Sequence, residues 1–94
     1  MNRADIVGKI AEATGMTRAE VSTVFEGILK LITAELAHGG TVELRRFGTF
    51  RIAKRAARRA VNPRTGEPVV VPARVVPNFK SSPQLREAVR GLKP

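Results

Sequence analysis

Arginine and lysine side chains gather in the second half of this sequence, where together they could neutralise a polyanion. Residues 45–94 hold thirteen basic and two acidic side chains, whereas residues 1–44 hold four basic and six acidic ones. The whole chain of 94 residues carries a net charge of +9. Such an uneven distribution indicates a nucleic acid as the partner, with an anionic lipid surface as a poorer second.

The most basic stretch surrounds a strong turn signal. The segment "RAVNPRTGEPVV" (residues 59–70) places Asn62-Pro63 and Thr65-Gly66 between two branches, at about 54–61 and 68–76. Asparagine before proline and a following glycine are typical of a tight turn. The pattern therefore predicts a two-stranded ribbon with a polar, proline-tipped end, and the alternative interpretation is a solvated loop.

Two prolines in the second branch support the ribbon. Pro68 and Pro72 have the same parity, so in a strand their missing N–H groups would lie on one outer edge and leave the other edge free to pair. A ribbon with no third strand is only marginally stable in water. We therefore expect it to be mobile until it meets a partner.

The sequence contains few residues that could bind a metal or carry out catalysis. There is no cysteine, and His38 is the only histidine, so thiolate and most zinc sites are excluded. The basic segment contains no pair of carboxylates, and the chain has neither a Ser–His–Asp set nor a P-loop. We expect no enzyme activity, cofactor or metal site. We also expect no membrane segment and no signal peptide, and hence a soluble protein of a reducing compartment.

The first forty residues predict two helices. Asn2 can cap the first, with Asp5 in its first turn and Gly15 as its left-handed stop. The segment "TRAE", residues 17–20, is a capping box that starts the second. That second helix is strongly apolar and ends at Gly39-Gly40. Its stripe is either an ordinary core face or, in part, a dimer interface.

Residues 41–52 predict two short strands. Thr41–Arg45 and Thr49–Ile52 alternate polar and apolar residues, with Phe47-Gly48 as a turn or bulge between them. We interpret Phe47, Phe50 and Phe79 as core rather than as platforms for stacking bases, because residues 53–76 contain no aromatic residue. Val75 and Val76 are expected to return to the same core.

A short helix is predicted near the end of the sequence. Ser81 or Ser82 can cap it, Pro83 suits its first position and Gly91 can stop it. Lys80 stands just before this helix. The helix start is therefore interpreted either as a phosphate-binding place or simply as a cap.

The order helix–helix–strand–strand–ribbon–helix, with "FGTF", "NPRTGEP" and "VPNFK", resembles the bacterial HU and integration host factor family over nearly the whole chain. The resemblance implies an α+β fold in an intertwined dimer, with a β-saddle, a long β-ribbon arm and a C-terminal helix. It implies one domain, residues 1–94. Its parts are a helical dimerisation part (1–40), a saddle and arm (41–80, arm about 54–75), and a C-terminal helix and tail (81–94).

The resemblance also assigns roles to residues. Pro63 is implied to be a wedge that enters a base step, although proline at this position is also a turn former. The DNA-binding residues are expected to be Arg46, Lys54, Arg55, Arg58, Arg59, Asn62, Pro63, Arg64, Arg74, Lys80 and Arg86. Basic residues occupy both parities of the arm.

Two departures from the family pattern stand out. The family usually has glycine where this chain has Arg46, and proline-glycine where it has Ser81-Ser82. Arg46 adds a charge near the expected DNA surface but puts the local strand geometry in question. Ser81-Ser82 keeps a capping residue, so we expect the last helix to form.

The function implied is that of an architectural protein, located in the cytoplasm at the nucleoid. It would bind double-stranded DNA through the minor groove with little sequence specificity, bend it and compact the nucleoid. Its other partner would be a second copy of itself or a paralogous subunit. A site-specific bender like integration host factor is the alternative, and an RNA-binding ribosomal-type protein a distant one.

Overall fold

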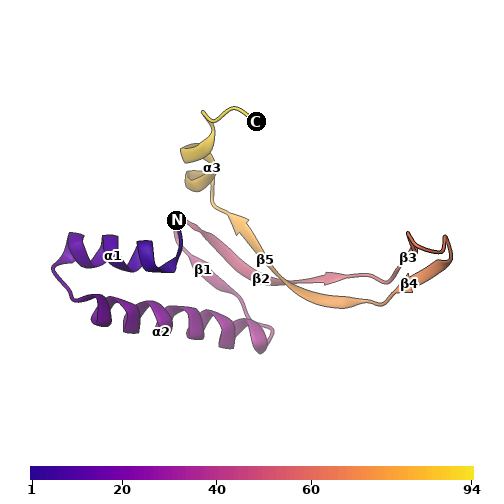
Figure 1. The fold of residues 1–94 in the computed structure, drawn as a ribbon, viewed down its shortest axis with the longest axis horizontal. Coiled ribbons are helices and arrows are strands. Elements are labelled where there is room, and N and C mark those ends of the chain that lie inside the picture. Colours follow the sequence, from indigo (N-terminus) through magenta and orange to yellow (C-terminus); the bar gives the residue numbers. More distant parts are fainter. The chain divides into compact units, whose positions relative to one another are not determined.

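The computed structural model describes all 94 residues, which form three helices and five strands (Figure 1). The elements are α1 (Arg3–Thr14), α2 (Arg18–Ala37), β1 (Val42–Leu44), β2 (Gly48–Arg55), β3 (Arg58–Val61), β4 (Pro68–Val71), β5 (Arg74–Ser81) and α3 (Pro83–Val89). The expected α+β class and order of elements are confirmed. Internal contacts divide the chain into Met1–Ala34 and Glu35–Pro94, which are described separately.

The first helix starts and ends at the predicted residues. The Asn2 side chain accepts a hydrogen bond from the Asp5 N–H at 3.0 Å, and the Asp5 carboxylate accepts one from the Asn2 N–H at 2.9 Å. Gly15 ends α1 with a left-handed φ of 77°. Because these signals act within a few residues, they operate without help from the rest of the fold.

The predicted capping box at α2 is formed by Thr17 and Glu20. The Thr17 N–H donates to the Glu20 carboxylate at 3.0 Å, and the Glu20 N–H donates to the Thr17 hydroxyl at 3.1 Å. The backbone N–H of Thr17, followed by its side chain, holds the pKa of Glu20 below its ordinary value. The capping carboxylate is therefore ionised at neutral pH.

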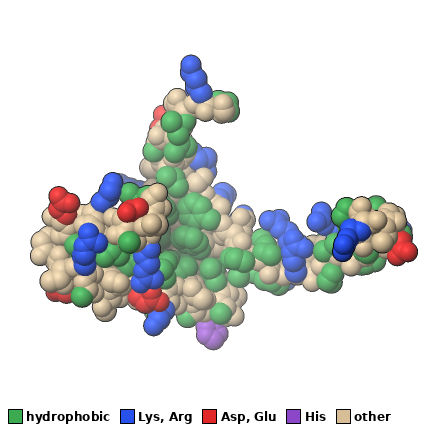
Figure 2. Space-filling view, viewed as in Figure 1, with side chains coloured by type: hydrophobic (Ala, Val, Ile, Leu, Met, Phe, Trp, Pro, Cys, Tyr) green, Lys and Arg blue, Asp and Glu red, His purple; other side chains and the backbone are tan.

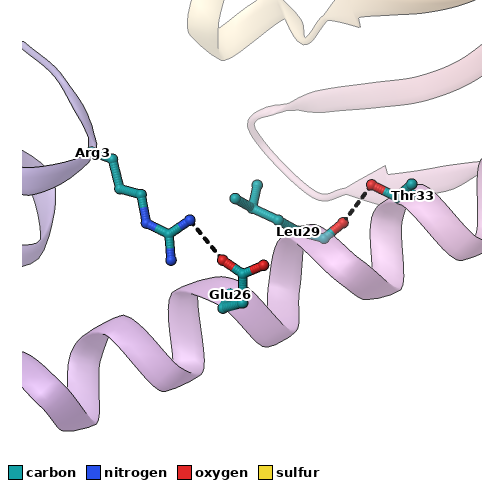
Figure 3. A network of polar contacts seen from close by, with 4 residues as sticks. All are labelled: Arg3, Glu26, Leu29 and Thr33. Carbon is teal, nitrogen blue, oxygen red and sulfur yellow. Dashed lines mark hydrogen bonds and ion pairs between the residues drawn. The ribbon is translucent and has the colours of Figure 1, made fainter.

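Within the first unit, the start of α1 is held to α2 by one arginine (Figure 3). The Arg3 guanidinium lies 2.6 Å from the Glu26 carboxylate and 5.2 Å from the centroid of the Phe25 ring. One turn further along α2, the Thr33 hydroxyl donates to the Leu29 carbonyl at 2.8 Å. The charge of Arg3 is thus paired with that of Glu26.

The single chain buries little apolar surface. Val7 and Val21 are its only buried hydrophobic residues. The apolar stripe of α2 stays largely exposed: Leu31 is 73% exposed, Val24 55% and Ile28 50%. Burial of apolar surface is the main favourable contribution to folding, so the stripe remains available for a further partner.

The three-stranded sheet has the order β1-β2-β5, and all its pairs are antiparallel. Directly opposite residues share a face. The register places Val42, Phe50 and Phe79 in one row, so one face is apolar. The Phe79 ring lies 4.9 Å from Phe50 and 5.4 Å from Phe47 between centroids, so the three predicted core rings cluster, while Phe47 is 47% and Phe79 37% exposed in the single chain.

The prediction that Val75 and Val76 both return to this core is wrong. Val75 lies on the apolar face but is 61% exposed in the single chain, and Val76 lies on the other face. Its register partner is Ala53, whereas Val75 pairs with Lys54. Because successive side chains of a strand point to opposite faces, Val76 lies on the face opposite Phe79.

The predicted turn at Phe47-Gly48 lies slightly earlier in the chain. The Phe47 N–H donates to the Leu44 carbonyl at 2.9 Å, so the turn centres on Arg45 and Arg46. Gly48 is already the first residue of β2. A Cβ atom there would come within 2.6 Å of the Lys80 carbonyl oxygen and would overlap the Phe79 ring, so glycine is needed for close packing rather than for the turn.

The arm is a two-stranded ribbon, as predicted, but it is interrupted. β3 pairs with β4 from Arg58↔Val71 to Val61↔Pro68. This continues the register of β2 and β5, whose last pair is Arg55↔Arg74. Ala56-Ala57 on one branch and Pro72-Ala73 on the other belong to no strand. Pro68 thus begins a strand, whereas Pro72 lies in the interruption.

The last helix forms despite the departure at Ser81-Ser82. The Ser82 hydroxyl accepts from the Leu85 N–H at 3.0 Å, and Pro83 is the first helical residue. Ser81 is the last residue of β5. No helix of the chain is both long and apolar enough to cross a membrane.

Candidate nucleic-acid interface

The face of the sheet opposite the phenylalanines is basic. The register brings Arg51, Arg55, Arg74 and Lys80 to this side of β2 and β5, which we call the basic face. Glu43, which pairs with Thr49, is the only acidic residue on it. Lys and Arg side chains continue along the ribbon (Figure 2). The basic face and the ribbon together present a large excess of positive charge over a long surface.

The structure differs from the predicted set of site residues at two positions. Lys54, a predicted site residue, pairs with Val75 and lies at the outer end of the apolar face. Arg51, absent from the predicted set, pairs with Asn78 on the basic face. The sequence did contain the signal for Arg51, because Phe50 and Ile52 point inward and the residue between them must point outward.

The ribbon carries charge on both of its faces. Arg58 shares one face with Val71, and Arg59 shares the other with Val70. Val70 is 72% exposed and Val61 66%. The ribbon therefore presents arginine beside exposed aliphatic surface, a combination suited to a groove whose walls are sugars and whose edges are phosphates.

The tip is closed by hydrogen bonds that do not involve Pro63. The Asn62 N–H donates to the Glu67 carbonyl at 2.9 Å, and the Gly66 N–H donates to the Asn62 carbonyl at 2.8 Å. The Asn62 side chain also accepts from the Arg64 N–H at 2.9 Å. Gly66 has a left-handed φ of 73°. Asn62 and Gly66 thus shape the turn, and Pro63 is exposed at its point.

Arg46 adopts a conformation that arginine rarely takes. Its φ of 69° makes it the only residue other than glycine with a positive φ. In the turn from Leu44 to Phe47 it occupies the third position, where a left-handed residue is normally glycine or asparagine. The chain therefore keeps the backbone shape of a glycine at this position and accepts about 1–2 kcal/mol of strain.

Replacing Arg46 with glycine should stabilise the protein. We expect Arg46→Gly to raise the free energy of unfolding by about 1 kcal/mol, because the gain from relieved strain exceeds the added entropy of the unfolded chain. Chemical denaturation at fixed protein concentration measures this. Arg45→Gly is the matched control, since it removes the same charge from a residue without the positive φ. If both variants change the free energy of unfolding equally, the claim that Arg46 is strained is contradicted.

A hollow of about 450 Å³ adjoins this turn, and basic and hydroxyl side chains line much of it. Arg45, Arg46 and Lys80 contribute its positive charges, and Glu43 contributes a carboxylate. Arg86, from α3, donates from its guanidinium to the Ser81 carbonyl at 2.6 Å. The structure thus brings the predicted residues Arg46 and Lys80 together, while Arg86 lies on the neighbouring helix with its guanidinium tied to the backbone.

Ten of the eleven predicted site residues therefore form three groups, and Lys54 lies apart at the outer end of the apolar face. Arg46, Lys80 and Arg86 lie around the β1–β2 turn and α3, and Arg55 and Arg74 end the sheet. The ribbon and its tip hold Arg58, Arg59, Asn62, Pro63 and Arg64. No group of three or more His, Cys, Asp or Glu side chains is placed to hold a metal ion. The arrangement offers charge, hydrogen-bond donors and an exposed proline, which are the means of holding a polyanion.

Fold and site together define a small basic α+β protein that presents a ribbon arm. The chain matches the family described as "Bacterial DNA-binding protein" over residues 1–90. DNA-binding protein HU of Thermotoga maritima is 37% identical over 90 residues, covering 96% of this chain and 100% of that protein. DNA-binding protein HRL18 of Rhizobium leguminosarum is 36% identical over 89 residues, covering 95% and 98%.

Solved structures of HU proteins are also similar to this chain. An Anabaena HU–DNA cocrystal structure has a TM-score of 0.91 with 33% identity and covers 98% of this chain and 100% of that one. HU from Thermotoga maritima has a TM-score of 0.68 with 27% identity and covers 95% and 98%. This chain belongs to the bacterial DNA-binding protein family, the family of HU.

Proposed function

We propose that this protein bends duplex DNA by inserting its arm into the minor groove, with little sequence preference, and so compacts the nucleoid. The observation that carries the proposal is the exposed Pro63 at the point of a basic ribbon whose closing hydrogen bonds do not need it. Minor-groove architectural proteins insert apolar residues between base steps and kink the duplex. The family membership and the HU–DNA cocrystal neighbour support the same function.

The basic face is proposed to hold the DNA backbone while the arm enters the groove. Phosphate contacts position a protein on the duplex without reading its sequence. The minor groove itself carries a degenerate code. Asn62 is the only side-chain amide in the ribbon between residues 54 and 76, and its oxygen is occupied by the Arg64 N–H. These features support binding with little sequence preference.

The exposed apolar surface supports a dimer. The stripe of α2 has no partner in the single chain, and an apolar hollow of about 100 Å³ lies beside it. The hollow is lined by Ile10, Met16, Val21, Val24, Phe25 and Ile28. A protein with two buried hydrophobic residues lacks the core of an independent domain. We propose that a second copy, or a paralogous subunit, covers this surface.

Gel shifts on linear, nicked and cruciform duplexes test the proposed function. A bender pays the cost of deforming a linear duplex, so we expect tighter binding to nicked and cruciform DNA, where the deformation is already made. Random and defined linear duplexes should bind alike. Strong preference for one defined duplex would favour a site-specific bender, and preference for RNA duplexes would overturn the proposal.

The arm should be sensitive to protease until DNA orders it. We expect trypsin to cut the free protein first after Arg58, Arg59 or Arg64, because the ribbon is two-stranded and exposed. Saturating duplex DNA should slow these cuts, since the same arginines would lie against the groove. Mass spectrometry of timed digests identifies the sites. Cleavage after Lys30, in α2 of the first unit, is the internal control, and equal rates in the arm with and without DNA would contradict the proposed contact.

A further inference from the structure

Two arginines face each other at the last rung of the sheet. Arg55 of β2 and Arg74 of β5 are register partners, and both are exposed. Directly opposite residues have Cβ atoms about 4.5–5.5 Å apart, and like charges in this position destabilise the pairing. Every other rung of β2 and β5 avoids this arrangement: Arg51 faces Asn78, Lys54 faces Val75 and Lys80 faces Thr49.

The chain itself supplies no carboxylate to this pair. Its ion pairs are Arg3 with Glu26 and Arg90 with Glu87. Glu67 lies at the tip, seven residues from Arg74, and Glu43 pairs with Thr49, six residues from Arg55. At about 3.3 Å per residue, either carboxylate is roughly 20 Å away along the strands. The repulsion between Arg55 and Arg74 is therefore not compensated within the free chain.

The position of Arg55 and Arg74 in the fold indicates which group compensates their repulsion. Beyond this rung the strands stop for two residues on each branch and resume as β3 and β4. Arg55 and Arg74 also share the basic face with Arg51 and Lys80. The pair thus stands at the base of the arm, on the surface proposed to follow the DNA backbone rather than at the tip that enters the groove.

We propose that Arg55 and Arg74 form a clamp for a single phosphate of the DNA backbone at the base of the arm. This inference rests on the proposed DNA-bending function and adds a specific positioning site to it. A phosphodiester carries one negative charge and two free oxygens, so each guanidinium can donate to one of them. The phosphate offsets the repulsion across the rung and closes the ladder where the arm begins.

The clamp has opposite consequences for the free and the bound protein. Without DNA, removing either charge relieves the repulsion and stabilises the ladder. With DNA, removing either charge breaks the two-sided grip on the phosphate. A phosphate held at this rung also fixes the point on the duplex from which the arm departs, because backbone contacts set register and orientation.

A double-mutant cycle with Arg55→Gln and Arg74→Gln tests the clamp. Binding of a linear duplex is measured over a range of monovalent salt concentrations, and thermal unfolding is measured without DNA. We expect either single variant to bind about tenfold more weakly, with a salt slope lower by about 0.9 per protomer, the value for one phosphate. The double variant should lose little more in affinity or slope. Both singles should unfold at a higher temperature than the parent.

Arg51→Gln provides the matched control, because Arg51 lies on the same face opposite a neutral residue. Its effect on affinity should add fully to that of Arg55→Gln, and it should not raise thermal stability. Arg74→Glu is the second variant. It places a carboxylate opposite Arg55, so it should stabilise the free protein more than Arg74→Gln does while weakening DNA binding further.

The outcomes separate the clamp from the function on which it rests. Additive losses in the double variant, with a slope lower by about 1.8 per protomer, would mean two separate phosphates and would overturn the clamp. Unchanged affinity in both singles would overturn it as well. A parent protein with no salt-dependent DNA binding would overturn the proposed function instead.

Discussion

The affinity of this protein for duplex DNA is expected to fall about a thousandfold or more when monovalent salt rises from roughly 50 to 200 mM. Each neutralised phosphate releases a condensed counterion, which contributes about 0.9 to the slope of log affinity against log salt. Residues 45–94 have a net charge of +11, and a dimer presents this charge twice. Fluorescence anisotropy of a labelled duplex, repeated over a salt series, measures the slope.

One charge removed from the proposed interface can be compared with one removed elsewhere. Arg51→Gln takes a charge from the basic face and should lower the slope by about 0.9 per protomer. Arg90→Gln takes a charge whose guanidinium faces Glu87 at 3.3 Å on α3, so it should leave the slope nearly unchanged. A nearly flat salt response of the parent protein would contradict the electrostatic account of binding.

Replacing Pro63 with alanine should reduce DNA bending more than it reduces binding. Unstacking a base step costs a few kcal/mol, which a rigid apolar wedge offsets through contacts inside the opened step. Alanine removes most of that bulk and all of the rigidity, while the arginines of the arm remain. Affinity for linear duplex should therefore fall several-fold, and affinity for nicked duplex, where the stack is already broken, should fall much less.

The structure also indicates that Pro63→Ala keeps the shape of the tip. The closing hydrogen bonds come from the Asn62 and Gly66 N–H groups and from the Asn62 side chain. Pro68→Ala is the matched control, because it makes the same substitution at the start of β4, away from the point of the turn. If Pro63→Ala discriminates between linear and nicked DNA no more than the parent does, Pro63 is only a turn former and the wedge assignment fails.

Local residue chemistry was sufficient to predict most elements of this fold. Asn2, Gly15, the Thr17–Glu20 box and Ser82 act within a few residues of themselves, and all appear as predicted. The turn at Asn62-Pro63 and the two branches of the arm likewise appear where their composition indicated. The burial of the α2 stripe depends on a second chain, so the sequence could only leave core and interface as alternatives.

Part of what the sequence analysis missed follows from alternation within one strand. Val76 and Phe79 lie three residues apart in β5, and Arg51 and Lys54 three residues apart in β2, so each pair must lie on opposite faces. The Arg55–Arg74 rung cannot be seen until the two strands are aligned, because the two arginines lie nineteen positions apart in the sequence. The positive φ of Arg46 reverses the usual preference of arginine, so composition alone pointed away from it. The roles of the predicted DNA-binding residues stay predictions.

The central claim, that this protein bends duplex DNA, is tested most directly by energy transfer between dyes on the two ends of a short linear duplex. Anisotropy of the same duplex reports binding in parallel. As protein is added, the transfer should rise together with the anisotropy and reach its plateau at the same protein concentration, because each binding event brings the ends closer. Anisotropy that saturates while the transfer stays at the value of the free duplex would show binding without bending and would contradict the account.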